Sequence, residues 1–345
     1  MKLNLMSLGD HITDPITGQR PTAAERHRMM VEAAVVAEDA GFDGVNIGEH
    51  HCLEYIYSSP PVVLAAIAER TSTLRLGTAV TLMANLDPLR AAEDYATLDA
   101  LSGGRVDIVA GRGNFFASTY TLFGQHVDES RERFDEGIEL LHQLWTSPDG
   151  VEWKGQFRPP INGEKLQPPP LQQAAPIWIG GGSSPETAEL AARLGLKLML
   201  PSAFGNPAVF KPVADAFRES YLAHGHESDP EVGACWHVNV GPTSRAARAR
   251  WEPRYRRYHE WMMEMLTAVN PSLPKHMKPF DYDWLLNSGP AIAGSPQEVV
   301  DRISELSELL GATTHLLYLD MGGMPQDELL DMVELLGSEV IPKLA

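Results

Sequence analysis

Short apolar runs with strand-type composition alternate along the chain with longer segments whose apolar residues recur at helical spacing. The apolar runs predict eight strands, at residues 3–8, 44–48, 74–80, 106–111, 176–180, 196–200, 232–240 and 313–318. The segments between them predict helices at residues 23–40, 61–71, 88–101, 130–145, 185–194, 207–224, 244–263 and 296–310. Alternation of strand and helix is typical of a parallel sheet, and eight such units predict a closed α/β TIM barrel, (β/α)8.

Three long segments fit no strand–helix unit and are expected as loop insertions in a single domain spanning residues 1–345. They cover about residues 113–129, 147–175 and 270–293. A plain barrel needs about 250 residues, so the chain has room for them. Because long connections in compact domains tend to be functional, we expect the first and third to wall a pocket. The third is expected to be a mobile lid or, equally, a disordered surface insertion.

The net charge and the cysteine content of the chain limit the classes of partner that it is expected to bind. The formal net charge of −18 repels nucleic acid backbones and anionic membranes. One basic stretch, residues 254–258 with Arg248 and Arg250 upstream, lies in a helical pattern and is interpreted as a solvated face. The two cysteines, Cys52 and Cys235, suit neither a disulfide framework nor a metal cluster, and the sequence shows no leader pattern and no membrane-length apolar run. We therefore expect a cytoplasmic protein with no metal, nucleic acid or membrane partner.

The run Glu49-His50-His51 directly follows the second predicted strand. In an α/β barrel the catalytic groups lie at the carboxyl ends of the strands. Because alternate residues of an extended chain point to opposite sides, one histidine can face a pocket while the other packs or hydrogen-bonds behind it. The ordinary histidine pKa, about 6.5, suits proton transfer near neutral pH. A strand end with two half-buried, hydrogen-bonded histidines is an equally open interpretation.

A glycine-rich turn follows the fifth predicted strand and leads into a helix. Its backbone amides, two hydroxyls and the helix dipole converge on one point, which predicts an anion site at Gly181, Gly182, Ser183 and Ser184. The serines can donate to an anion or merely cap the helix. The turn matches neither the dinucleotide fingerprint nor a nucleoside triphosphate loop.

Two arginines can complete this anion site. Arg112 follows the fourth predicted strand, and Arg131 begins the helix after the first insertion. Each could donate two hydrogen bonds to a phosphate, or could instead be a surface ion pair with Asp128 or Glu129. Together with the glycine-rich turn they predict a phosphate pocket.

The end of the third predicted strand, residues 76–82, carries no acid, base or nucleophile. Its small apolar residues could offer a flat wall to an aromatic ring. The chain also lacks the Gly-x-Ser-x-Gly elbow of serine hydrolases. These features favour an enzyme that uses a cofactor.

With these motifs in place, the chain resembles the bacterial luciferase-like family of flavin-dependent monooxygenases along its whole length. The order and spacing of several motifs carry the resemblance together. They are Ala40-Gly41-Phe42-Asp43 leading to Glu49-His50-His51, Leu76-Gly77-Thr78-Ala79, the run from Asp87 to Asp94, Ser102-Gly103-Gly104-Arg105, Gly111-Arg112-Gly113, Phe123-Gly124 with Ser130-Arg131, Ala175-Pro176-Ile177-Trp178, and Gly294-Ser295-Pro296-Gln297-Glu298.

The resemblance implies a (β/α)8 barrel that binds reduced flavin mononucleotide (FMNH2) from a separate flavin reductase and activates O2 as a flavin C4a-hydroperoxide. It implies that His50 lies beside the flavin and that Glu49 orients His50. It also implies a non-proline cis peptide at Ala79-Val80 beneath the flavin ring. The phosphate-holding positions of the family correspond to three residues, Arg112, Arg131 and Ser183.

The chain departs from luciferase itself at two positions. Gly111 stands where luciferase has a cysteine, and Gly182 where it has an acid, so light emission is not expected. Asn114, Phe115 and Phe116 stand where the substrate side of the pocket is expected, with ordinary loop packing as the alternative.

The resemblance therefore predicts a monooxygenase that acts on a small organic substrate, of the aldehyde, ketone, sulfonate or secondary-metabolite class. Relatives that use the deazaflavin F420 share the barrel but usually replace the glutamate–histidine–histidine run, which favours FMN here. An F420-dependent oxidoreductase that transfers a hydride without O2 stays open, as does a non-catalytic flavin-binding subunit. Relatives are mostly homodimers or larger, so we expect a homo-oligomer, most simply a homodimer.

Overall fold

Eight parallel strands close into a barrel in the computed structural model, which describes residues 1–181, 184–269 and 280–344. Going round the ring, each strand pairs with the next, and β10 pairs with both β9 and β12 to close it. The ring consists of β1 (Lys2–Ser7), β2 (Gly44–Ile47), β3 (Arg75–Thr78), β5 (Val106–Gly111), β8 (Ile177–Gly180), β9 (Lys197–Leu200), β10 (Val232–Val240) and β12 (Thr314–Tyr318). The predicted TIM barrel is confirmed, and each predicted strand contributes to the ring.

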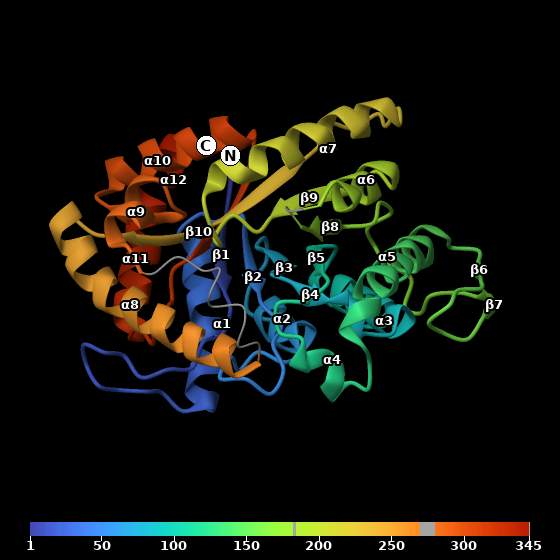
Figure 1. The fold of residues 1–345 in the computed structure, drawn as a ribbon, viewed down its shortest axis with the longest axis horizontal. Helices are drawn as coiled ribbons and strands as arrows, with labels where there is room; N and C mark the ends of the chain where they lie inside the picture. The colour runs from blue at the N-terminus through green and yellow to red at the C-terminus, as the bar shows by residue number, and fades with distance from the viewer. Residues whose placement is uncertain (182–183, 270–279, 345) are drawn as a thin grey trace.

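Helices surround this ring (Figure 1). They are α1 (Ala23–Asp39), α2 (Pro60–Ala68), α3 (Pro88–Ser102), α5 (Ser130–Thr146), α6 (Pro185–Arg193), α7 (Lys211–Ala223), α8 (Ser244–Val269), α10 (Pro296–Leu310) and α11 (Gln326–Glu339). Local sequence explains several starts, since Thr22 and Ser295 form capping boxes and Asp87 caps α3 ahead of Pro88. The sequence pattern did not predict α11, which follows the last strand. None of the helices described has the length and apolarity needed to cross a bilayer.

The insertions contain short elements of their own. Residues 113–129 form α4 (Ser118–Leu122) and η2 (Val127–Glu129), and residues 147–175 form an antiparallel hairpin of β6 (Val151–Trp153) and β7 (Ile161–Glu164). The last insertion includes α9 (Tyr282–Asn287) and β11 (Ala291–Gly294), which pairs with the end of β10. Residues 270–279 of the predicted lid (270–293) lie outside the described residues, and the assignment of this segment as a lid stays a prediction.

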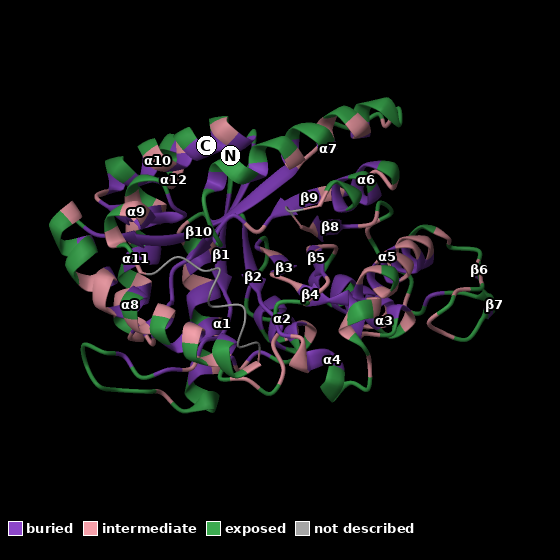
Figure 2. Ribbon diagram, in the orientation of Figure 1, coloured by how far each residue is buried: buried purple, intermediate pink, exposed green. Residues whose placement is uncertain are grey.

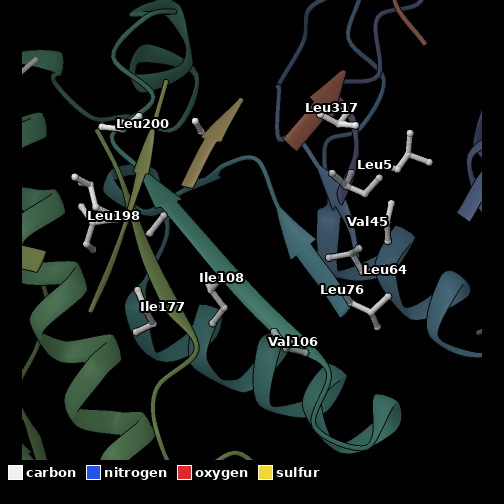
Figure 3. Packing of buried hydrophobic residues seen from close by; sticks show 14 of the residues in the cluster. Leu5, Val45, Leu64, Leu76, Val106, Ile108, Ile177, Leu198, Leu200 and Leu317 are labelled. Carbon is white, nitrogen blue, oxygen red and sulfur yellow. The ribbon is translucent and has the colours of Figure 1, made fainter. Parts of the chain in front are cut away.

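Alternate residues of the strands supply two separate apolar layers, as strand geometry requires. On β8, Ile177 and Ile179 join the larger cluster, which lies between strands and helices, while Trp178 between them joins the second cluster. The strands of the ring are largely buried (Figure 2), and Figure 3 shows part of the larger cluster, including Leu198 and Leu317. The second cluster fills the barrel interior and continues onto the aromatic face of α8, so the barrel is a packed core and not a pore.

The interpretation of the basic stretch on α8 as a solvated face was wrong at Arg254. Its side chain is buried and forms ion pairs with Asp14 at 2.9 Å and with Glu328 at 2.8 Å, while Arg256 and Arg257 remain partly exposed. Removing one partner of such a buried pair commonly costs about 3–5 kcal/mol. Arg254 therefore holds α8 against the loop that follows β1 and against α11.

Candidate active site

The predicted site residues meet at one end of the barrel, because the carboxyl ends of parallel strands lie together. Going round the ring, β2 leads to Glu49 and His50, β3 to Ala79 and Val80, β5 to Arg112 and β8 to the glycine-rich turn. Only β3 and β5 separate β2 from β8 in the ring. The histidine and the glycine-rich turn therefore share the same rim.

A small apolar shelf lies between these two features. The Ala79–Val80 peptide bond is cis, and glycines end the adjoining strands. A Cβ atom at Gly111 would lie 2.5 Å from Val80 Cγ2, and one at Gly180 would lie 3.1 Å from Val80 Cγ1. A Cβ atom at Gly48 would lie 3.1 Å from the Ala79 carbonyl oxygen. Side chains at these three positions would crowd Ala79 and Val80, so the glycines allow the shelf to form.

His50 packs against two aromatic rings at the rim. Its imidazole stacks on Tyr55 with 4.0 Å between ring centroids and meets Phe116 edge-on at 5.8 Å. Its Nδ1 atom is buried and has no hydrogen-bond partner within the described part of the chain. Burial lowers the pKa of His50 to about 3, helped by the nearby His51 and opposed by a hydrogen bond with the Leu8 backbone. The ring is therefore neutral at physiological pH, and the ordinary pKa expected from the sequence does not hold.

Glu49 interacts with the second histidine and not with His50. Its Oε1 atom lies 2.8 Å from His51 Nε2, and its Oε2 accepts a hydrogen bond from the Leu82 N–H at 3.0 Å. His51 also meets the Phe123 ring edge-on at 4.8 Å. The expectation that Glu49 orients His50 is corrected accordingly. Glu49 instead holds β4 (Thr81–Leu82), which directly follows the shelf.

The predicted anion site is organised around Arg131. Its guanidinium donates to Ser184 Oγ at 2.8 Å and to Thr187 Oγ1 at 2.9 Å, and Ser184 caps α6. Gly181 does not offer a free amide, because its N–H donates to the Met199 carbonyl at 3.0 Å. It is required for packing instead, since a Cβ atom there would lie 2.5 Å from Thr187 Cγ2. Gly182 and Ser183 lie outside the described residues.

Arg112 adds a second positive charge beside the first. Burial lowers its pKa, and the charge of Arg131 lowers it further. Arg112 makes no side-chain hydrogen bond or ion pair with any residue of the described ranges. Within the described residues neither Arg112 nor Arg131 forms an ion pair with Asp128 or Glu129; Glu129 pairs with Arg133 at 2.9 Å, and Arg131 faces Asp135 at 3.9 Å. Two neighbouring guanidiniums at the N-terminus of α6 favour a doubly charged anion.

The predicted substrate residues follow β5 along the rim. Phe116 is buried against His50, whereas Asn114 is exposed and Phe115 is 42% exposed. The Phe115 ring lies 6.0 Å from Phe204, which follows β9. Of the three residues, Phe116 therefore lies closest to His50.

Sequence reasoning missed several groups at this rim. His237 on β10 is buried, with its Nε2 3.0 Å from the Ala203 carbonyl oxygen and its Nδ1 unpartnered within the described residues. Burial lowers its pKa to about 4. The buried face of α8, with Trp251, Tyr258 and Trp261, was also missed. Aromatic residues at helical spacing were a usable signal, but the arginines between them hid it.

A barrel whose strand ends carry an anion cradle, an apolar shelf and a half-buried histidine is typical of enzymes that bind a phosphorylated ligand. The crystal structure of the monooxygenase RslO1 from Streptomyces bottropensis superposes with a TM-score of 0.87, at 27% identity over 100% of both chains. The oxygenase component of a flavin-dependent trigonelline monooxygenase from Acinetobacter baylyi is 25% identical over 87% of this chain and 85% of its own. An F420-dependent glucose-6-phosphate dehydrogenase from Amycolatopsis mediterranei is 34% identical over 49% of this chain and 51% of its own.

A model of the luciferase-like monooxygenase family matches residues 1–314. The chain belongs to this family, and the resemblance seen in the sequence is confirmed. The family includes FMN-dependent monooxygenases and F420-dependent oxidoreductases, so the protein is an oxidoreductase.

Proposed function

We propose that the protein is a monooxygenase that uses reduced FMN, delivered by a separate flavin reductase, and O2 to oxygenate a small organic substrate. The observation that carries this proposal is the pair of guanidiniums on Arg112 and Arg131, placed on the same rim as His50 with the Ala79–Val80 shelf between them. Such a site would bind a terminal phosphate at the two arginines and a flat ring on the shelf. His50 would then lie beside the ring as the proton-transfer group.

The residues present fit FMN well. A terminal phosphate monoester carries about −1.5 to −2 charges at pH 7, which matches two cations at a helix N-terminus. Arg131, held by Ser184 and Thr187, would bind one side of the phosphate, and Arg112 has its guanidinium available for the other. The apolar surface at Ala79 and Val80 suits a planar ring. When bound, reduced FMN would supply two of the four electrons that O2 takes up, and the substrate would supply the other two as it gains one oxygen atom.

The chain itself would supply proton handling and exclusion of water. His50 is neutral, so its Nδ1 atom can accept a hydrogen bond and take a proton transiently, while a pKa of about 3 keeps it from holding that proton. Phe116 and Tyr55 enclose its ring on two sides. An apolar enclosure of this kind keeps water from competing for reactive oxygen.

A second candidate is hydride transfer with reduced F420, favoured by the 34% identity to an F420-dependent dehydrogenase over half the chain. A phosphodiester such as that of F420 carries one negative charge on its phosphate, whereas the terminal monoester of FMN carries about −1.5 to −2, which matches two adjacent guanidiniums better. The cradle therefore favours FMN. A non-catalytic flavin-binding subunit would also explain the two arginines. It would give no role to His50, which is neutral and whose Nδ1 atom has no hydrogen-bond partner among the described residues.

The test is a turnover experiment under 18O2. We expect FMNH2 and a panel of aldehydes, ketones, sulfonates and secondary metabolites to give at least one product that contains a single 18O atom, detected by mass spectrometry. A parallel assay with reduced F420 should give no product. Product formation with F420 and without 18O would support the dehydrogenase instead. Flavin binding without substrate-dependent O2 uptake across the panel would indicate a non-catalytic subunit.

A further inference from the structure

A line of buried hydroxyl groups leads away from the His50 side of the rim. The Tyr55 and Tyr258 hydroxyl oxygens are 2.8 Å apart, and the Tyr258 ring packs edge-on against the Tyr318 ring with 5.9 Å between centroids, so the Tyr318 hydroxyl also acts on that of Tyr258. The Tyr318 hydroxyl donates to Asp10 Oδ1 at 2.5 Å. All four side chains are buried, so water does not interrupt the line.

Four separate parts of the fold bring these groups together. Asp10 follows β1, Tyr318 ends β12, Tyr258 lies on the buried face of α8, and Tyr55 lies in the loop after β2. The two loops pair as a short antiparallel bridge in which Asp10 lies opposite Tyr55. The Ile56 N–H donates to the Gly9 carbonyl at 2.8 Å, which fixes this register. The arrangement depends on the whole barrel end and not on one local motif.

The surroundings of Asp10 favour the uptake of a proton. Among the described residues one cation, Arg26 on α1, faces both Asp10 and Asp320, and its ion pair is with Asp320 at 2.5 Å. Burial and the charge of Asp320 raise the pKa of Asp10 to about 6, against Arg26 and the hydrogen bonds from Tyr318 and the Gly322 N–H. The groups that face Asp10 are Arg26 of α1, Asp320 and Gly322 after β12, Tyr318 of β12, Tyr258 of α8, and Tyr55 and Tyr57 of the β2 loop.

The other end of the line reaches the candidate active site. The Tyr55 ring stacks on the His50 imidazole at 4.0 Å between centroids, and its other contacts include the edge of Trp261 at 4.7 Å. Burial raises the pKa of Tyr55, Tyr258 and Tyr318 well above neutral pH. The three phenols therefore stay protonated and can each pass on one proton while accepting another.

We propose that Asp10 is the terminal proton acceptor of the active site and that Tyr55, Tyr258 and Tyr318 conduct the proton to it. A proton released beside His50 binds the Tyr55 oxygen while Tyr55 gives its own proton to Tyr258, Tyr258 to Tyr318, and Tyr318 to the Asp10 carboxylate. Each tyrosine ends neutral, and the carboxylate becomes a carboxylic acid. Asp10, Tyr258 and Tyr318 act through Tyr55 and are positioning residues. The role of Asp10 as proton acceptor for the active site rests on the proposed function. The connection between Asp10 and the three tyrosines does not depend on that function.

The line can be tested in the cofactor-free protein by NMR with 13Cζ-labelled tyrosine. We expect the Tyr55, Tyr258 and Tyr318 signals to shift together with a midpoint at about pH 6, because protonation of Asp10 changes every bond of the line. Asp10→Asn should abolish all three transitions. Tyr258→Phe should abolish the transition of Tyr55 and keep that of Tyr318. Tyr120 of α4 is buried, donates to the Arg112 carbonyl and meets no histidine ring within the described residues, so it is the internal control and should not respond. Tyr221 of α7, which is bonded to Ser228 but packs on the His226 ring at 4.6 Å, serves only as the control for turnover.

A Tyr55 signal that ignores pH in the wild type, or a transition that persists in Asp10→Asn, would overturn the proposal. If Asp10→Asn does not fold, Tyr258→Phe decides, because it leaves the Asp10 contacts to Tyr318 and Gly322 in place. The pH profile of turnover supplies the second measurement, with whichever cofactor proves active. Its inflection near pH 6 should be lost in Tyr258→Phe and kept in Tyr221→Phe. Retention of the inflection in Tyr258→Phe would overturn the role of the line in the reaction, even with the NMR coupling intact.

Discussion

Replacing both cradle arginines, in an Arg112→Ala/Arg131→Ala double variant, is expected to weaken FMN binding by about a thousandfold. A hydrogen bond to a charged group contributes about 1.5–3 kcal/mol, and each 1.4 kcal/mol is about a factor of ten in affinity. Arg131 is already oriented by Ser184 and Thr187, so little freedom is lost when it binds phosphate. Anaerobic calorimetric titration with FMNH2 measures the effect.

The matched control for this variant is Arg133→Ala. Arg133 lies on the same helix as Arg131 but pairs with Glu129 and packs on the Phe157 ring. Its replacement should leave the affinity for FMNH2 within about threefold of wild type, since a partly exposed ion pair contributes about 0–1 kcal/mol. If the double variant, folded by circular dichroism, lost less than tenfold in affinity, the cradle would not be the phosphate site.

His50→Ala is expected to lower the rate of product formation by about a hundredfold or more, the range typical of a lost general acid or base. Binding of FMNH2 should change far less, because His50 lies at the shelf end and not among the arginines. Rapid-mixing measurement of product yield per flavin oxidised separates the two effects. Since burial holds the pKa of His50 at about 3, its titration should add no inflection between pH 5 and pH 8.

His224→Ala controls for the loss of an imidazole elsewhere. His224 is exposed on the outer surface and pairs with Glu189 at 2.9 Å. This variant should keep wild-type turnover and yield. An unchanged product yield in His50→Ala would remove His50 from the mechanism and leave only its packing role against Tyr55.

The sequence predicted the barrel and the position of the site because both depend on local patterns. Eight apolar runs were enough to count the strands, and parallel strands place the residues after them on one rim. Glu49, His50 and Arg112 were found by this rule, whereas Arg131 was found as an arginine at the start of the helix after the first insertion. The cis peptide at Ala79–Val80 came from family resemblance, since nothing in the local pattern indicates it.

The sequence could not predict interactions between distant segments. Arg254 looked solvated among its charged neighbours, but its partners Asp14 and Glu328 lie far away in the chain. Glu49 was assigned to the wrong histidine because spacing does not show which side chain turns inward. Asp10 carries no motif at all, and its environment arises only when β1, β12, α1 and α8 meet.

The most direct test of the central claim is a crystal structure of the protein with FMN bound. We predict the phosphate within hydrogen-bonding distance of both Arg112 and Arg131 at the start of α6, and the ring on the Ala79–Val80 shelf beside His50. A phosphate bound elsewhere, or a ring away from His50, would contradict the account.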